Sequence, residues 1–123
     1  MNDKLKIGVN IVKENIKPEF ESVWKRVCNT DETPDYQILI WGSTVQDKDR
    51  EPIDLDIIIE YTGSTIDPDK EKSIESIIKD DVYTKEFSYV DPIVKHRFET
   101  SQIISNSRVS EVYSVTQEAW INP

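Results

Sequence analysis

The stretch Ile53-Asp54-Leu55-Asp56-Ile57-Ile58-Ile59-Glu60-Tyr61 gives the strongest strand pattern in this chain of 123 residues. Its β-branched and aromatic residues favour extended backbone. Side chains of a strand alternate between two faces, so the odd-numbered positions form one apolar face, and the other carries Asp54, Asp56, Ile58 and Glu60. We therefore predict a strand over residues 53–61 that buries one face in a core and presents two aspartates on the opposite face.

Three shorter segments predict further strands. Residues 36–41 are mainly apolar and lie between Pro34 and Gly42, which indicates a buried strand. Residues 85–90 predict a strand that ends at Asp91, because a residue before proline avoids the α-helical region. Residues 112–115 predict a last strand at the edge of the sheet, followed by a polar tail over 116–123.

Helical periodicity precedes and separates these strands. Pro18 interrupts the first helical region, and either starts a second helix or kinks a continuous one, because proline lacks a backbone donor. This region ends near Asn29, and residues 67–79 predict another helix with Asp67 as its N-cap. The stripe of the first region has spacings of three and four: Val9, Val12, Ile16, Phe20, Val23, Trp24 and Val27.

Residues 93–104 predict a last helix. Within it, Lys95-His96-Arg97 forms either a solvated helix face or a contact for phosphates or an acidic partner. The resulting order is helix, strand, strand, helix, strand, helix, strand, which is typical of an α+β fold with helices covering a mixed sheet. The length and the lack of linkers or repeats predict one domain over residues 1–123. Trp24 and Trp41 are expected in the core, and Trp120 either packs against the domain or anchors a partner.

Charge and composition narrow the classes of function. The net charge of −9 and the pI near 4.6 oppose binding to nucleic acid, because such binding is driven mainly by basic side chains on phosphates. One cysteine, Cys28, and one histidine exclude an internal disulfide and a structural zinc site of four nitrogen and sulfur ligands. No segment has the pattern of a signal peptide or a membrane span, so we expect a soluble, cytoplasmic protein.

The pair Asp54 and Asp56 is the first candidate site. Residues two apart in a strand have Cα atoms about 6.5–7 Å apart, so their carboxylates can converge on divalent cations. The same spacing at 47/49 and 67/69 has ordinary explanations, because those residues lie in a polar run and at a helix cap. Only Asp54 and Asp56 interrupt an apolar strand, which indicates a magnesium site, the alternative being two solvated residues on an exposed sheet face.

Gly42-Ser43 is the second candidate site. The glycine permits close approach to the backbone, and the amides and hydroxyl that follow a strand can hold phosphate oxygens. A helix N-cap at Ser43 uses the same geometry, so this dipeptide alone does not discriminate between the two roles.

Together these motifs resemble the nucleotidyltransferase superfamily, in its minimal nucleotidyltransferase branch. The pattern is Ile40-Trp41-Gly42-Ser43, followed by Asp54-Leu55-Asp56-Ile57 twelve positions after Gly42. The resemblance implies a small mixed sheet of the DNA polymerase beta-like kind. It also implies that Asp54 and Asp56 coordinate Mg²⁺, two ions in all, and that Gly42 and Ser43 hold the phosphates of ATP or another nucleoside triphosphate.

The resemblance assigns Asp91 as a third carboxylate that completes the metal site and helps to activate the attacking hydroxyl. A turn-forming aspartate before Pro92 is the alternative. The implied reaction transfers AMP from ATP to a hydroxyl. Because the chain has no room for an acceptor domain, a partner protein or a small molecule presents that hydroxyl, as in the antitoxin half of toxin–antitoxin pairs.

Three positions depart from the minimal branch, which commonly has Arg-Gly after Gly-Ser and a serine before the first aspartate. This chain has Gln46-Asp47 and Ile53 in those places. The departures motivate a second hypothesis, in which the chain keeps the fold as a protein-interaction module or antitoxin without catalysis. Extension of nucleic-acid ends is the third and is opposed by the acidic charge.

Overall fold

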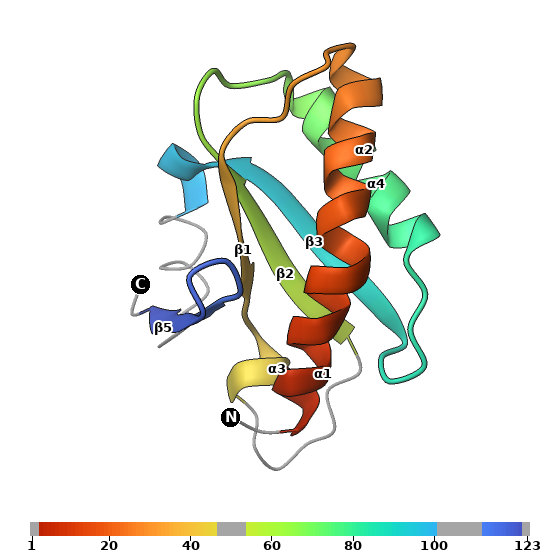
Figure 1. The fold of residues 1–123 in the computed structure, drawn as a ribbon, viewed down its shortest axis with the longest axis vertical. Coiled ribbons are helices and arrows are strands. Elements are labelled where there is room, and N and C mark those ends of the chain that lie inside the picture. Colours follow the sequence, from red (N-terminus) through yellow and green to blue (C-terminus); the bar gives the residue numbers. More distant parts are fainter. Residues whose placement is uncertain (1–2, 47–53, 101–111, 122–123) are drawn as a thin grey trace.

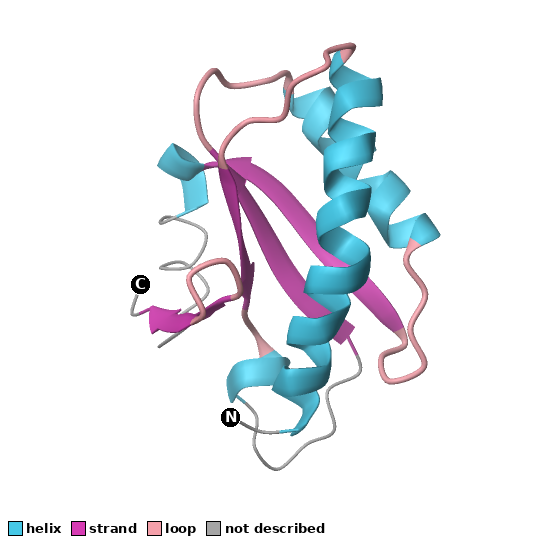
Figure 2. Ribbon diagram, viewed as in Figure 1, coloured by secondary structure: helices cyan, strands magenta, loops and turns pink. Residues whose placement is uncertain are grey.

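This computed structural model describes residues 3–46, 54–100 and 112–121. Its fold is built on a five-stranded mixed sheet (Figures 1 and 2). The strand order is β3-β2-β1-β4-β5, in which β2 and β3 are parallel and all other neighbours are antiparallel. The strands are β1 (Tyr36–Ile40), β2 (Asp54–Tyr61), β3 (Tyr89–His96), β4 (Val112–Ser114) and β5 (Ala119–Ile121). The predicted α+β class with helices on a mixed sheet is confirmed.

The N-terminal helical region forms one continuous rod (Figure 1). It comprises α1 (Asp3–Ile11), a π-helical turn η1 (Val12–Ile16) and α2 (Lys17–Cys28). Pro18 lies in the first turn of α2, and the wide turn before it accommodates the proline without breaking the rod. The helix α2 ends as predicted at Asn29, which is left-handed with φ of 52°.

Two further helices are α3 (Ser43–Gln46) and α4 (Pro68–Asp81). The Asp67 carboxylate accepts a hydrogen bond from the Asp69 amide at 2.8 Å, so the predicted N-cap of α4 is confirmed. None of the helices that the structure describes is long and apolar enough to cross a membrane.

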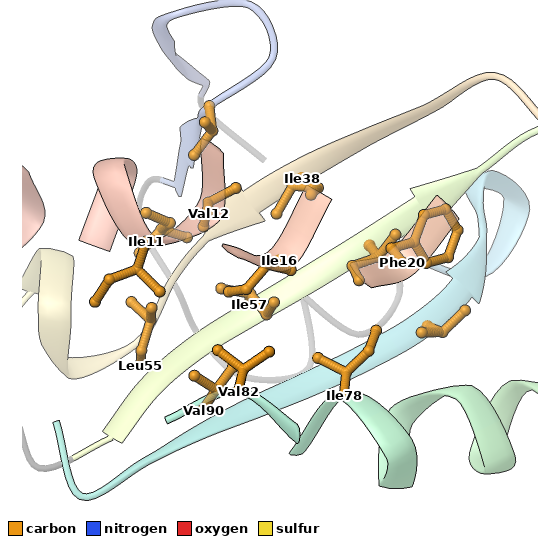
Figure 3. Packing of buried hydrophobic residues seen from close by; sticks show 14 of the residues in the cluster. Ile11, Val12, Ile16, Phe20, Ile38, Leu55, Ile57, Ile78, Val82 and Val90 are labelled. Atoms are coloured by element: carbon orange, nitrogen blue, oxygen red, sulfur yellow. The ribbon is translucent and has the colours of Figure 1, made fainter. Parts of the chain in front are cut away.

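The main core lies between the helical rod, α4 and one face of the sheet (Figure 3). The β2 residues Leu55, Ile57, Ile59 and Tyr61 all point into it and are fully buried. The predicted alternation of β2 is therefore confirmed, and only Ile53 falls outside the described residues. From the helices, residues such as Ile16, Phe20 and Ile78 pack onto this face.

The opposite face of the sheet carries a smaller apolar cluster of Leu39, Ile58 and Val112. Trp41 is partly buried against this cluster rather than in the main core, whereas Trp24 is buried in the main core as predicted. Asp54 and Asp56 belong to the same face as Ile58, because positions of equal parity in a strand share a face.

The predicted boundaries of the third strand are wrong. β3 begins at Tyr89 and continues through Pro92 to His96, so Asp91 lies inside the strand and 93–96 are not helical. The physical reason is the place of β3 at the edge of the sheet, where the missing proline donor breaks no required ladder bond. Helix is present only over 97–100, and the rest of the predicted helix lies outside the described residues.

Because β3 extends to His96, the surroundings of the basic residues 95–97 also differ from the prediction. His96 is buried in β3, with Nε2 at 2.7 Å from the Gly63 carbonyl oxygen. Lys95 donates to Glu71 Oε1 at 3.4 Å, and Arg97 alone of the three is exposed. A solvated helix face is therefore wrong for Lys95 and His96.

The C-terminal predictions also need correction. β4 lies between β1 and β5 rather than at the edge, and the predicted polar tail contains the edge strand β5. Trp120 of β5 is 43% exposed and packs edge-on against Tyr113, with ring centroids 5.3 Å apart. Trp120 and Ile121 favour extended backbone, but a segment of three residues depends on pairing with β4 to form a strand.

Replacing Tyr61 with phenylalanine is expected to destabilise the core by about 1–3 kcal/mol in urea unfolding. The buried Tyr61 hydroxyl donates to Glu71 Oε2 at 2.8 Å and accepts from the Ile66 amide at 3.0 Å, and burial raises its pKa to about 12. Without it, the buried Glu71 loses a donor. Tyr36→Phe is the matched control, because its partner Glu21 is only partly buried and can be hydrated. Equal losses for the two variants would contradict the role of the Tyr61 hydroxyl.

Candidate functional site

Three aspartates lie together at one end of the sheet. Asp54 and Asp56 come from the start of β2, and Asp91 of β3 is the register partner of Asp56. Neighbouring strands are about 4.8 Å apart and paired residues share a face, so the three carboxylates face the same side. We call Asp54, Asp56 and Asp91 the acidic cluster. Figure 1 shows that the starts of β2 and β3 and the helix α3 lie at the same end of the sheet.

Gly42 connects the β1 end to this cluster. Its φ is +75°, and a Cβ atom at this position would lie only 2.6 Å from Asp56 Oδ2. The adjoining Trp41 amide donates to the Asp56 carbonyl oxygen at 3.1 Å. Glycine therefore meets two requirements here, a left-handed backbone and space for the carboxylate. The two motifs found in the sequence lie in direct contact.

The short helix α3 follows Gly42 directly. The Val45 amide donates to the Gly42 carbonyl oxygen at 3.1 Å, which closes the first turn after the glycine. Thr44 is buried, and its hydroxyl donates to the Asp54 carbonyl oxygen at 3.3 Å. These bonds hold the backbone of Gly42 and Ser43 against the start of β2. Thr44 was not among the residues predicted from the sequence, because its role depends on this contact between segments.

Crowding of the carboxylates changes the protonation of Asp56. Burial raises its pKa to about 6, and the charges of Asp91 and Asp54 and a hydrogen bond with Asp91 act in the same direction. No cationic side chain in the described part of the chain contributes to this shift. Asp56 therefore keeps its proton to a higher pH than an ordinary aspartate does.

Tyr89 lies at the same end of the sheet as the acidic cluster. It is the register partner of Asp54, its side chain is 41% exposed, and its pKa is raised chiefly by a hydrogen bond to Asp54. The Lys79 ammonium lies 4.8 Å from the centroid of its ring. Tyr89 was predicted only as part of a strand over 85–90, because its partner Asp54 becomes visible only with the β2–β3 register.

Two polar atoms close to this cluster lack partners. Asp54 Oδ1 and Trp41 Nε1 are buried and have no hydrogen-bond partner among the described residues. Buried polar atoms in native proteins are nearly always hydrogen-bonded, and exceptions are frequent at sites for ligands or ions. An unpartnered carboxylate oxygen beside two further aspartates is a donor set suited to a hard cation.

The chemistry of these oxygens fits Mg²⁺, but their present arrangement is not a finished metal site. No group of three or more histidine, cysteine, aspartate or glutamate side chains in residues 3–46, 54–100 and 112–121 is arranged to hold a metal ion. A cation bound here would have to compete with the proton that Asp56 keeps to an unusually high pH.

All five predicted site residues are therefore at one end of the sheet. The backbone brings Gly42 and Ser43 to Asp54 and Asp56, and the strand register adds Asp91. Comparisons with protein-family models, curated proteins and solved structures found no match for this chain. Its function is accordingly inferred from its own residues.

Proposed function

We propose that this chain is a magnesium-dependent nucleotidyltransferase with a nucleotidyltransferase-like arrangement of its sheet. It would transfer a nucleoside monophosphate, AMP from ATP, to a hydroxyl on a partner protein or a small molecule. The observation that carries the proposal is the contact between Gly42 and Asp56, where Oδ2 fills the space of the absent Cβ. This contact joins a backbone corner suited to phosphates to a carboxylate group suited to Mg²⁺.

Each residue has a defined part in this proposal. Asp54 and Asp56 would hold Mg²⁺, and Asp91, in register with Asp56, would complete the site and receive the proton of the attacking hydroxyl. The backbone at Gly42 and Ser43 would receive phosphate oxygens. When bound, the cation supplies charge to offset the phosphates and the leaving pyrophosphate. The residues themselves position the reactants, which is most of what phosphoryl-type transfer requires.

Binding of Mg²⁺ is coupled to loss of a proton in this proposal. Asp56, with its pKa raised to about 6, must release its proton and open its hydrogen bond to Asp91 before both carboxylates can bind. Affinity for Mg²⁺ should therefore rise with pH through about 6. This requirement separates the acidic cluster from an ordinary solvated group of carboxylates.

Incubation with ATP labelled at the α-phosphate, Mg²⁺ and extract of the source cell should transfer label to a macromolecule. Asp54→Asn and Asp56→Asn should each lower the transfer by more than ~100-fold, because each removes a charged ligand. Asp31→Asn is the control, since Asp31 is exposed in the turn after α2. Label that persists unchanged in both site variants, or that never forms, contradicts the proposal.

Terbium provides a readout of the cation site that does not depend on catalysis. Bound Tb³⁺ should luminesce on excitation of tryptophan, because Trp41 lies beside Asp56. The emission should rise through pH 6, be displaced by excess Mg²⁺ and be lost in Asp56→Asn but not in Asp31→Asn. Emission that does not differ between these two variants contradicts a cation site at the acidic cluster.

A second candidate function is a non-catalytic member of the same fold that acts as an interaction module. The glutamine at position 46, where the resembled branch has arginine, and the net charge of −9 favour it, because both weaken binding of a triphosphate. Thermal unfolding separates the two candidates. An enzyme should gain about 2.7 kcal/mol from MgATP at 100 times its dissociation constant, whereas a module without a nucleotide site should not respond.

A further inference from the structure

The end of the sheet opposite the acidic cluster carries a second group of polar side chains. Glu60 lies six residues beyond Asp54 in β2, about 20 Å away at about 3.3 Å per residue, and on the same face. Figure 1 shows that the end of β2 and the start of β1 lie away from α3. Glu60, Gln37 and Arg97 line a hollow of about 230 Å³ here. This volume is below the ~300–1,000 Å³ of clefts for drug-sized molecules, so it suits a smaller ligand.

The Glu60 side chain lines this hollow although it is only 8% exposed. Its carboxylate accepts hydrogen bonds from Gln37 Nε2 at 2.8 Å and from the Thr100 hydroxyl, which are both neutral donors. Lys95, its register partner in β3, donates instead to Glu71. Within the part of the chain that the structure describes, Glu60 forms no ion pair. A buried carboxylate is normally balanced by an opposite charge, so Glu60 has capacity for a cationic group.

Arg97 supplies a positive charge to the same hollow. It is exposed, and its guanidinium forms no ion pair with any described residue. The Thr100 hydroxyl bonds both the Glu60 carboxylate and the Arg97 carbonyl oxygen, which fixes the backbone of Arg97 close to Glu60. Two opposite charges therefore line one small hollow without pairing with each other. A ligand that carries both kinds of charge can bridge them.

The lining favours an ammonium group over a metal ion at Glu60. Hard cations take about six oxygen ligands, and Glu60 is a single carboxylate whose oxygens already accept two hydrogen bonds. An ammonium group needs three acceptors, which Glu60 can share with the hydroxyl-bearing Thr62 and Thr116 of the same lining. The planar guanidinium of Arg97 matches a carboxylate through two parallel hydrogen bonds. Asp35 also lines the hollow, and its negative charge disfavours a ligand that is only an anion.

We propose that this hollow binds a free amino acid, whose ammonium group is held at Glu60 and whose carboxylate is held at Arg97. We call it the amino-acid pocket. The inference goes beyond the proposed nucleotidyltransferase function and does not depend on it, because the acidic cluster lies about 20 Å away along β2. The ligand joins β2 to the segment after β3, so its binding stabilises the folded state.

Titration of the purified full chain with each standard amino acid, followed by NMR of the side-chain amides, tests this inference. Gln37 and Gln117 line the pocket, so their amide signals should shift with at least one amino acid. The decarboxylated and the deaminated analogues of that amino acid should each bind at least about tenfold more weakly, because each lacks one charged contact. If no amino acid shifts these signals, or if either analogue binds as tightly as its parent, the inference is wrong.

Two variants test the assigned contacts. Arg97→Gln should weaken binding of the amino acid at least about tenfold and leave binding of the decarboxylated analogue unchanged, because only the parent carries the group held by Arg97. Glu60→Gln should weaken binding of both compounds by a similar factor. The Thr100 hydroxyl can donate or accept, so this glutamine can keep its hydrogen bonds. Arg26→Gln is the control, since Arg26 is exposed on α2 and outside the pocket.

Asp54→Asn separates failure of this inference from failure of the proposed function. This variant should lose the proposed transfer and keep amino-acid binding unchanged. Binding that requires Asp54, or that is equal in Arg97→Gln and the natural sequence, overturns the inference alone. A chain that binds the amino acid but transfers no label contradicts only the proposed function. If Glu60→Gln does not fold, the exposed Arg97 still decides the outcome.

Discussion

Replacing Asp56 with asparagine should make the protein more stable at pH 8 while abolishing the activity proposed for it. The folded state raises the pKa of Asp56 to about 6, above the ordinary value of 3.8, because burial and two neighbouring carboxylates disfavour its charge. Asparagine keeps the size of the side chain and removes that charge. We expect a gain of about 1–2 kcal/mol at pH 8, because solvent screens this half-buried group. The melting temperature should rise by roughly 4–8 °C.

The sign of the pH dependence follows from the raised pKa. The protonated form of Asp56 stabilises the folded state fully below about pH 4, and this contribution is lost as the pH rises through about 6. The stability difference between Asp56→Asn and the natural sequence should therefore be small at pH 4 and complete above pH 7. Thermal melts at several pH values without divalent cations measure it.

Two controls make this result specific. Asp31→Asn removes a charge from an exposed turn and should leave the pH dependence unchanged. Addition of Mg²⁺ at pH 8 should stabilise the natural sequence but not Asp56→Asn, which narrows the difference between them. If Asp56→Asn is less stable than the natural sequence at pH 8 without Mg²⁺, then the charge of Asp56 does not destabilise the folded state.

The predictable parts of the fold are those in which the sequence pattern of a segment alone determines its secondary structure and its buried face. In β2, one apolar face and one mixed face follow directly from alternation, and the strand packs that way. The cap at Asp67 depends on residues adjacent in sequence and was likewise predictable. In contrast, Ala119–Ile121 is too short to predict a strand by itself, although it contains two strand-favouring residues, and β5 forms because β4 is beside it.

The same distinction holds for the candidate site. Gly42, Ser43, Asp54 and Asp56 belong to short motifs, and their proximity follows from the β1–β2 hairpin. Asp91 was proposed for the end of a strand but lies within one, because an edge strand tolerates Pro92. Tyr89 could not be found from sequence, since its relation to Asp54 depends on the register of two strands separated by a whole helix. Pairing over such distances is set by the packed structure and not by local preference.

Replacing Gly42 with alanine should reduce stability and disturb the site by two separable mechanisms. The first is backbone strain, because φ of +75° costs a residue with a Cβ atom about 1–2 kcal/mol. The second is contact, because the new Cβ would lie 2.6 Å from Asp56 Oδ2. A carboxylate can rotate away at little energetic cost, so this contact should move Asp56 more than it destabilises the fold. We expect a loss of about 1–3 kcal/mol in urea unfolding.

Gly63 offers the control that separates the two mechanisms. Its φ is +85°, but a Cβ there would meet no atom within 4 Å. Gly63→Ala should therefore show the backbone cost of about 1–2 kcal/mol and leave terbium and MgATP binding unchanged. Gly42→Ala should show a similar loss of stability together with at least about tenfold weaker binding of both probes, because the displaced carboxylate no longer faces Asp91. If the two variants bind terbium and MgATP equally well, Gly42 is needed only for its backbone conformation, and its contact with Asp56 has no part in ligand binding.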